Sequence, residues 1–138
     1  MALEIKKVEY FNITIESSTE EAYKLLSKFA NFGVSLLAFK AIPVEYKRTQ
    51  FSLFPNDGSK MKDAAKKAGL DLDGPHAALI IKSNSDEPGE CAGIFNKLSQ
   101  VDINNYEASG IADIYDSYGV VLYLNEKDCE KAIAAFKA

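Results

Sequence analysis

The predicted order of strands and helices occurs twice in this 138-residue chain, and this repeat constrains the fold more than any single motif. In the first copy, YFNITIE at Tyr10–Glu16 alternates apolar and polar residues, as a half-buried strand does. An amphipathic helix follows, in which Ser18 and Glu21 have the spacing of a capping box. Two strands and a second helix come next, at VSLLAFKAIPV from Val34, RTQFSLF from Arg48 and the apolar face Met61, Ala64, Ala65 and Ala68.

The second half of the chain repeats this order at an offset of about 68–69 residues. Phe51, for example, corresponds to Val120. The predicted elements are a strand HAALIIKS from His76, a helix face Cys91, Ile94, Phe95 and Leu98, strands DINNYEASGI from Asp102 and YGVVLYL from Tyr118, and a helix face Cys129, Ala132, Ile133 and Phe136.

Each copy therefore reads β-α-β-β-α, and one more strand would complete a ferredoxin-like βαββαβ unit. In the first copy, LDLDG at Leu70–Gly74 is a candidate for that strand. In the second copy the strand is either missing or supplied from elsewhere, with ALEIKKV near the N-terminus as a candidate. We expect an α+β fold of two tandem ferredoxin-like units with antiparallel sheets, residues 1–74 and 75–138. An uncovered sheet edge favours a homodimer.

Composition excludes several classes of function. The formal net charge is −4, and Arg48 is the one arginine among sixteen basic residues, so we expect no nucleic-acid partner. The sequence lacks a signal-peptide pattern and any apolar run of membrane-spanning length, so we expect a cytoplasmic protein without a membrane partner. Cys91 and Cys129 are interpreted as small buried residues in a reducing compartment. Two separate thiols and His76 make a poor metal site, and we expect no metal or cofactor.

The segment SDEPGECAGIFNKLSQVDIN resembles the start of an ACT domain, the small ligand-sensing module of amino-acid metabolism. Its turn Asp86-Glu87-Pro88-Gly89 is similar to that family's D-x-P-G turn, and Val101-Asp102-Ile103-Asn104 is similar to the start of its second strand. The family's Gly before that strand is replaced here by Val or Asp. The first copy keeps a Gly at its helix end, Gly33, but its turn Ser17-Ser18-Thr19-Glu20 lacks Pro-Gly.

The resemblance implies two ACT-like units, the first degenerate at its ligand loop, with helices on one face of the sheets. It implies a non-catalytic regulatory or sensor protein with allosteric behaviour. The ligand would be an amino acid or related small molecule, held where ACT units meet. A partner enzyme or regulator of amino-acid metabolism would respond to it.

The chemistry of an amino-acid site is available around Gly89. A glycine at a helix start allows close approach, and the free N–H groups there favour a carboxylate. Nearby acids would accept from an ammonium group, and they suit a zwitterion better than a bare anion. The candidate ligand-binding residues are Asn84, Ser85, Asp86, Glu87, Gly89 and Asn104. A structural interpretation stands beside this one: Asp86 would be a helix cap, and Gly89 would allow two units to pack closely.

Two other functions stay open at this point. A pure interaction module would use its sheet edges and helix faces for assembly and leave the loop empty. An enzyme is not expected, because the sequence has no nucleophile elbow and no phosphate-binding glycine loop, and a lone His76 assembles no triad.

Overall fold

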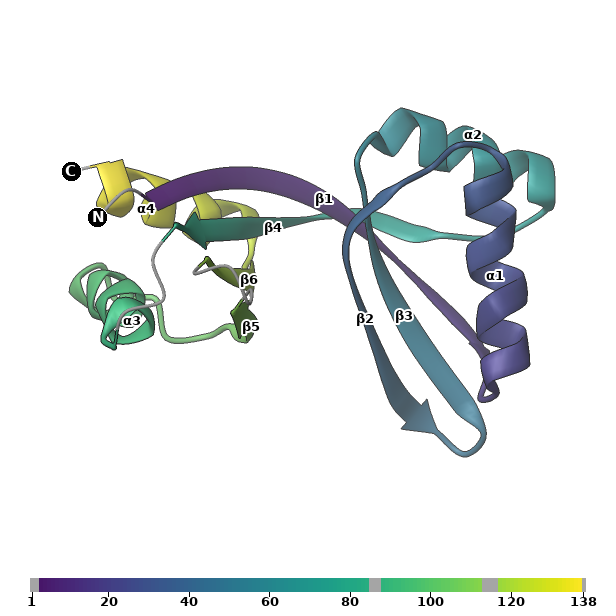
Figure 1. Ribbon diagram of the computed structural model, residues 1–138, viewed down its shortest axis with the longest axis horizontal. Coiled ribbons are helices and arrows are strands. Elements are labelled where there is room, and N and C mark those ends of the chain that lie inside the picture. The colour runs from purple at the N-terminus through teal and green to yellow at the C-terminus, as the bar shows by residue number, and fades with distance from the viewer. Residues whose placement is uncertain (1–2, 85–87, 113–116, 138) are drawn as a thin grey trace. The chain divides into compact units, whose positions relative to one another are not determined.

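The computed structural model describes residues 3–84, 88–112 and 117–137 (Figure 1). These residues form β1 (Leu3–Glu16), α1 (Thr19–Asn31), β2 (Leu36–Glu45), β3 (Arg48–Pro55), α2 (Gly58–Ala68), β4 (Asp73–Ser83), α3 (Glu90–Gln100), β5 (Glu107–Ala112), β6 (Tyr118–Tyr123) and α4 (Glu126–Lys137). The predicted α+β class is confirmed. Within the described residues, no helix has both the length and the apolar run that a membrane span requires.

The chain divides into two compact units that share two strands. One unit is Glu9–His76, and the other combines Met1–Val8 with Ala77–Ala138. Strand β1 gives its start to the second of these units and its end to the first, and β4 does the reverse. The N-terminal segment, the candidate for the missing strand, thus belongs to the unit that contains the second copy of the repeat.

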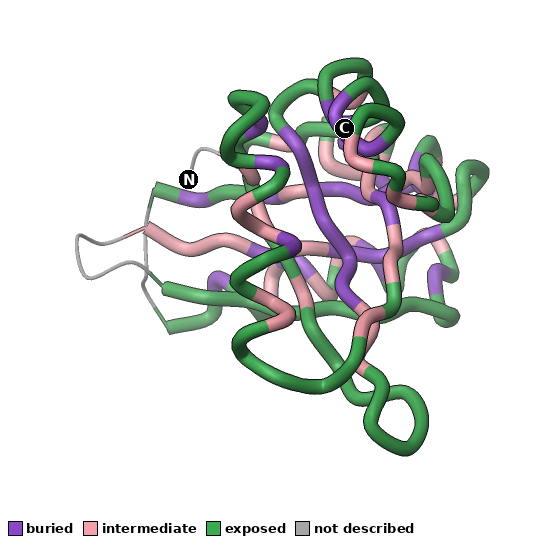
Figure 2. The backbone as a smooth tube through the Cα atoms, turned by 90° about the vertical axis from the view of Figure 1, so that its right-hand side faces the viewer, coloured by how far each residue is buried: buried purple, intermediate pink, exposed green. Residues whose placement is uncertain are grey.

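In the unit Glu9–His76 the strands are ordered β2-β3-β1-β4. Strand β1 pairs antiparallel with β3, with Phe11 opposite Leu53. Both helices pack their apolar faces on β1 and β3, because one core contains residues of α1, α2, β1 and β3. These core residues are Phe11, Leu25, Phe29, Phe51, Leu53, Met61, Ala64 and Ala65. Figure 2 shows how buried positions interrupt the exposed surface along the helices, as an amphipathic pattern predicts.

The helix ends in this unit follow their sequence signals. Ser18 caps α1, since its Oγ accepts a hydrogen bond from the Glu21 N–H at 3.0 Å. Asp57 caps α2 in the same way through the Lys60 N–H at 3.2 Å. Gly69 closes α2 in the left-handed conformation, with φ of 70°.

In the other unit the strands are ordered β1-β4-β6-β5, with β4 and β5 both antiparallel to β6. Its core joins β4, β6, α3 and α4, and Leu3 and Ile5 of β1 pack against it. Lys7 fastens the same strand to α4, where it bonds the carboxylates of Glu126 and Glu130. The hydrogen bond to Glu126 is the main reason why the pKa of Lys7 lies above its usual value.

Two predicted strands differ from the structure, because their residues help to end a helix. The Leu70 N–H donates to the Ala65 carbonyl at the end of α2, and strand structure begins only at Asp73, where β4 runs on to Ser83 without a break. The predicted strand from Asp102 begins only at Glu107, because the Ile103 N–H donates to the Leu98 carbonyl and closes α3.

Candidate functional site

The N-terminus of α3 has an unusual cap. Gly89 is the capping residue, in the left-handed region with φ of 97°, and no side chain of the described residues caps the helix in its place. A Cβ added at Gly89 would meet no described atom within 4 Å. The backbone conformation therefore explains the glycine, since L side chains rarely adopt this φ. Among the described residues, no capping side chain bonds the N–H groups in the first turn of α3.

Directly behind this helix start lies a buried hydrogen bond. The Ser83 Oγ, at the end of β4, donates to Glu90 Oε2 at 2.9 Å, and the two residues are 1% and 8% exposed. The bond ties the end of β4 to the first turn of α3. Ser83 is the last residue of β4, where the predicted strand HAALIIKS from His76 also ends.

The buried face of α3 also begins one residue earlier than predicted. Glu90, Ile94 and Leu98 are its buried residues, whereas Cys91 is exposed. The buried Ser83 hydroxyl gives the Glu90 carboxylate a partner, and the carboxylate takes the inner position. The interpretation of Cys91 as a buried residue is therefore wrong, while the one for Cys129 is confirmed.

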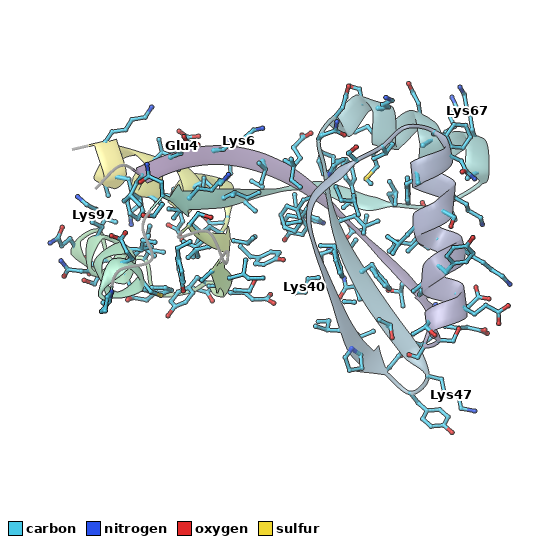
Figure 3. The ribbon with its side chains drawn as sticks, viewed as in Figure 1. Glu4, Lys6, Lys40, Lys47, Lys67 and Lys97 are labelled. Atoms are coloured by element: carbon cyan, nitrogen blue, oxygen red, sulfur yellow. The ribbon has the colours of Figure 1, made fainter. Side chains whose placement is uncertain are left out.

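A small hollow of about 140 Å³ opens beside this bond. It is lined by Glu4, Lys82, Ser83, Asn84 and Ser117, which all belong to the unit built around the second copy of the repeat. Figure 3 labels Glu4 on the first part of β1. The lining thus combines a carboxylate, an ammonium group, an amide and two hydroxyls.

The structure brings together only some of the predicted site residues. Asn84 lines the hollow, and Gly89 caps α3. Ser85, Asp86 and Glu87 lie outside the described residues. Asn104 is not among the lining residues: it is exposed in the segment before β5, where its Nδ2 donates to the Asp102 carbonyl at 3.4 Å.

Sequence reasoning missed Glu4, Lys82, Ser83, Ser117 and Glu90. The one available signal for Glu4 was the N-terminal segment itself, the candidate for the missing strand. For Lys82 the signal was its place near the end of a predicted strand, two residues before Asn84.

The first copy of the repeat has a hollow at the corresponding place. Ile15 pairs with Thr49 there, as Ser83 pairs with Tyr118 in the second copy. This hollow measures about 270 Å³ and is lined by Ile15, Ser17, Ser18, Thr19, Ala22, Thr49 and Phe51. The Ser17 and Thr49 hydroxyls are hydrogen-bonded to each other at 2.7 Å.

The exposed thiol of Cys91 lies near a tyrosine of β6. A hydrogen bond with Cys91 raises the pKa of Tyr118. The Tyr118 hydroxyl also stands over Gly110 of β5, where an added Cβ would lie 2.9 Å from it. This edge of the unit is therefore crowded by Tyr118, and Gly110 leaves room for it.

Comparisons of sequence give no match: no protein-family model and no curated protein matches the chain. Comparison of structure finds clear likenesses. A crystallised protein of Bacteroides thetaiotaomicron has a TM-score of 0.77 at 16% identity, over 96% of this chain and 90% of that one.

Two further likenesses are regulatory parts of one enzyme. The ligand-free regulatory subunit of aspartate kinase from Thermus thermophilus has a TM-score of 0.66 at 17% identity, over 97% of this chain and 92% of that one. A putative C-terminal regulatory domain of aspartate kinase from Porphyromonas gingivalis has 0.60 at 18%, over 97% and 94%. At these identities the likenesses show the fold: an α+β fold shared with regulatory domains of aspartate kinase and consistent with the ACT type.

Proposed function

We propose that this protein is a non-catalytic regulatory protein of amino-acid metabolism that binds a free amino acid at the N-terminal end of α3. The observation that carries the proposal is the 140 Å³ hollow at the end of β4, which brings one cationic and one anionic side chain together with Ser83, the residue whose hydroxyl bonds Glu90 in the first turn of α3. The lining of this hollow comes from one unit alone, and the two tandem ferredoxin-like units expected from the sequence remain part of the proposal.

The two charged ends of an amino acid suit different sides of this hollow. Its carboxylate would pair with the Lys82 ammonium group. A contact with N–H groups of the first turn of α3 remains a proposal from the sequence. Its ammonium group would pair with the Glu4 carboxylate, and Asn84 offers both donors and acceptors. Ser85, Asp86, Glu87 and Asn104 remain proposed contacts from the sequence.

The size of the hollow favours a small ligand. Sites for larger organic ligands usually measure about 300–1,000 Å³. At about 140 Å³, the hollow suits an amino acid with a short side chain. A bound ligand would stiffen the start of α3, and a partner enzyme or regulator would respond to that change.

A thermal-shift screen against the twenty amino acids tests this proposal. A ligand at about 100 times its dissociation constant adds roughly 2.7 kcal/mol to the free energy of unfolding, which raises Tm measurably. Lys82→Met should abolish the shift, whereas Lys127→Met, the same change at an exposed position of α4, should keep it. No shift from any amino acid, or an equal shift in Lys82→Met, would overturn the proposal. Gly89→Val is a poorer variant, because its backbone strain would itself lower Tm.

One observation favours a ligand-free assembly module as the second candidate. Strand β2 is the edge strand in the sheet order of its unit, where it forms a hairpin with β3 (Figure 1). This hairpin carries exposed apolar side chains. These are Leu37, Phe39, Ile42, Val44 and Tyr46, of which Phe39 is 60% and Tyr46 85% exposed. Such an edge suits pairing with a second copy in a homodimer.

Light scattering after size exclusion separates the two candidates. If the hairpin mediates assembly, Phe39→Lys should convert the dimer to a monomer, and Tyr23→Lys, which changes an exposed aromatic residue on α1, should not. An assembly module would lose its dimer in Phe39→Lys and show no amino-acid shift in any variant. An amino-acid sensor would show the shift in the wild-type protein.

A further inference from the structure

We propose that the first copy of the repeat carries a second, chemically different binding site, for a small uncharged molecule with an apolar body and a carbonyl oxygen. The site is the 270 Å³ hollow at the end of β1, the first turn of α1 and the start of β3. All its lining residues lie in the unit Glu9–His76, so the hollow is complete within that unit.

The floor of this hollow is apolar and fixed. Phe51 is buried in the core, and Ile15 and Ala22 are half-buried against that core. Phe51 also lies in the middle of β3, paired with Ile13 on one side and Ala41 on the other. The small side chain of Ala22 leaves space above this floor for an apolar group of a ligand.

The rim offers hydrogen-bond donors. The Ser18 Oγ already accepts from the Glu21 N–H, so its own hydrogen is left to donate. The Ser17 and Thr49 hydroxyls share one hydrogen bond at 2.7 Å, and whichever of them donates, the other keeps a hydrogen. A ligand with an acceptor such as a carbonyl oxygen would match this rim.

The charge of the ligand follows from the same lining. None of the seven lining side chains ionises near neutral pH. Moving a charged group onto this apolar floor is costly without a paired charge. The site therefore favours a neutral molecule over an ion of the same shape. This separates it from the hollow beside α3, which is lined by Glu4 and Lys82.

The test uses isobutyramide as the neutral probe and isobutyrate as its charged counterpart of the same shape. Each is titrated into isotopically labelled protein at neutral pH, and shifts of backbone and methyl NMR signals are followed. We expect saturable shifts from isobutyramide at Ser17–Ala22 and Thr49–Phe51, and about tenfold weaker binding of isobutyrate.

Three variants locate the site. Ala22→Phe should fill the hollow and weaken isobutyramide binding by about tenfold or more. Ala30→Phe, which makes the same change at an exposed position of α1, should bind as the wild type does. Thr49→Val removes one rim hydroxyl with little change of shape and should weaken binding about fivefold.

The proposal fails if isobutyramide gives no saturable shift at these residues in the wild-type protein. It also fails if isobutyrate binds equally well, or if Ala22→Phe keeps a dispersed NMR spectrum and still binds as tightly. If Ala22→Phe is unfolded, Thr49→Val tests the site independently. An unchanged affinity of Thr49→Val for isobutyramide would contradict the proposed donor hydroxyls at the rim.

Discussion

The two copies of the repeat start their first helices at corresponding places but with different chemistry. In the first copy, Ser18 caps α1 through its side chain, and a ring of hydroxyls surrounds an apolar hollow. In the second copy, Gly89 caps α3 without a side chain, and Glu4 and Lys82 line the hollow at the end of β4.

The difference shows that a single capping residue can bond the N–H groups at a helix start within the chain or leave them available to a ligand. A serine cap satisfies a helix N–H within the chain, which stabilises the helix by about 1 kcal/mol. A glycine cap forgoes this bond and leaves the N–H groups for another partner. The second copy is therefore the better candidate for a charged ligand, and the first for a neutral one.

The largest expected effect concerns the shared strand. Ile5→Asp places a charge against the core of the unit that contains the second copy, and we expect it to lower the free energy of unfolding by about 3–5 kcal/mol. Lys6→Asp, at the neighbouring exposed position labelled in Figure 3, should change it by about 0.5 kcal/mol or less. Urea denaturation followed by circular dichroism measures both. Equal effects would mean that β1 does not complete this unit.

The second effect compares the acidic residues in the first turns of the two helices. Glu90→Ala leaves the buried Ser83 hydroxyl without its acceptor, so we expect a loss of about 1–3 kcal/mol. Glu21→Ala, at the corresponding position of α1, keeps the backbone N–H that Ser18 caps and should cost about 0.5 kcal/mol or less. Glu90→Gln retains an acceptor and should lie between them. A negligible cost for Glu90→Ala in the same urea assay would contradict the role of this bond.

Smaller effects are expected where each first helix ends. Gly33 and Asp102 both have positive φ, 76° and 56°, and each precedes a residue whose N–H bonds back into the helix. Gly33→Ala should therefore lower stability by about 1 kcal/mol, and Asp102→Gly should raise it by up to about 1 kcal/mol. Calorimetric Tm values would show both signs. A lower Tm for Asp102→Gly would contradict the strain at that position.

The smallest effect changes reactivity and leaves stability nearly untouched. Cys91 is exposed, whereas Cys129 is buried, and burial raises the pKa of the Cys129 thiol. A thiol reagent should therefore modify one cysteine quickly in the native protein and the other only after unfolding. Cys91→Ser should remove the fast reaction. If the fast reaction survives in Cys91→Ser, the burial of Cys129 on α4 described above is wrong.

Periodicity and capping signals predicted most of the fold. The alternation in YFNITIE, the Ser18 cap and the Gly33 helix end all depend on neighbours within a few residues, and each appears in the structure. The burial of Glu90 in place of Cys91 could not be predicted in this way, because it depends on Ser83, a partner fixed by the tertiary fold.

The candidate site was predicted less completely than the fold. Local motifs led to Asn84 and Gly89, but Glu4 reaches the hollow from the other end of the chain. Its position depends on which unit the N-terminal strand joins, and periodicity does not specify strand neighbours. Asn104 was placed by analogy with a strand start, and the structure has a helix-closing segment there instead.

The most direct test of the proposed amino-acid site is a comparison of amide NMR spectra with and without a mixture of the twenty amino acids. Binding at the open helix start should shift the amide signals of Asn84, Gly89 and the first turn of α3, and leave those of Thr19–Ala22 in place. Unchanged spectra, or shifts confined to Thr19–Ala22, would contradict the view that the glycine-capped copy is the amino-acid site.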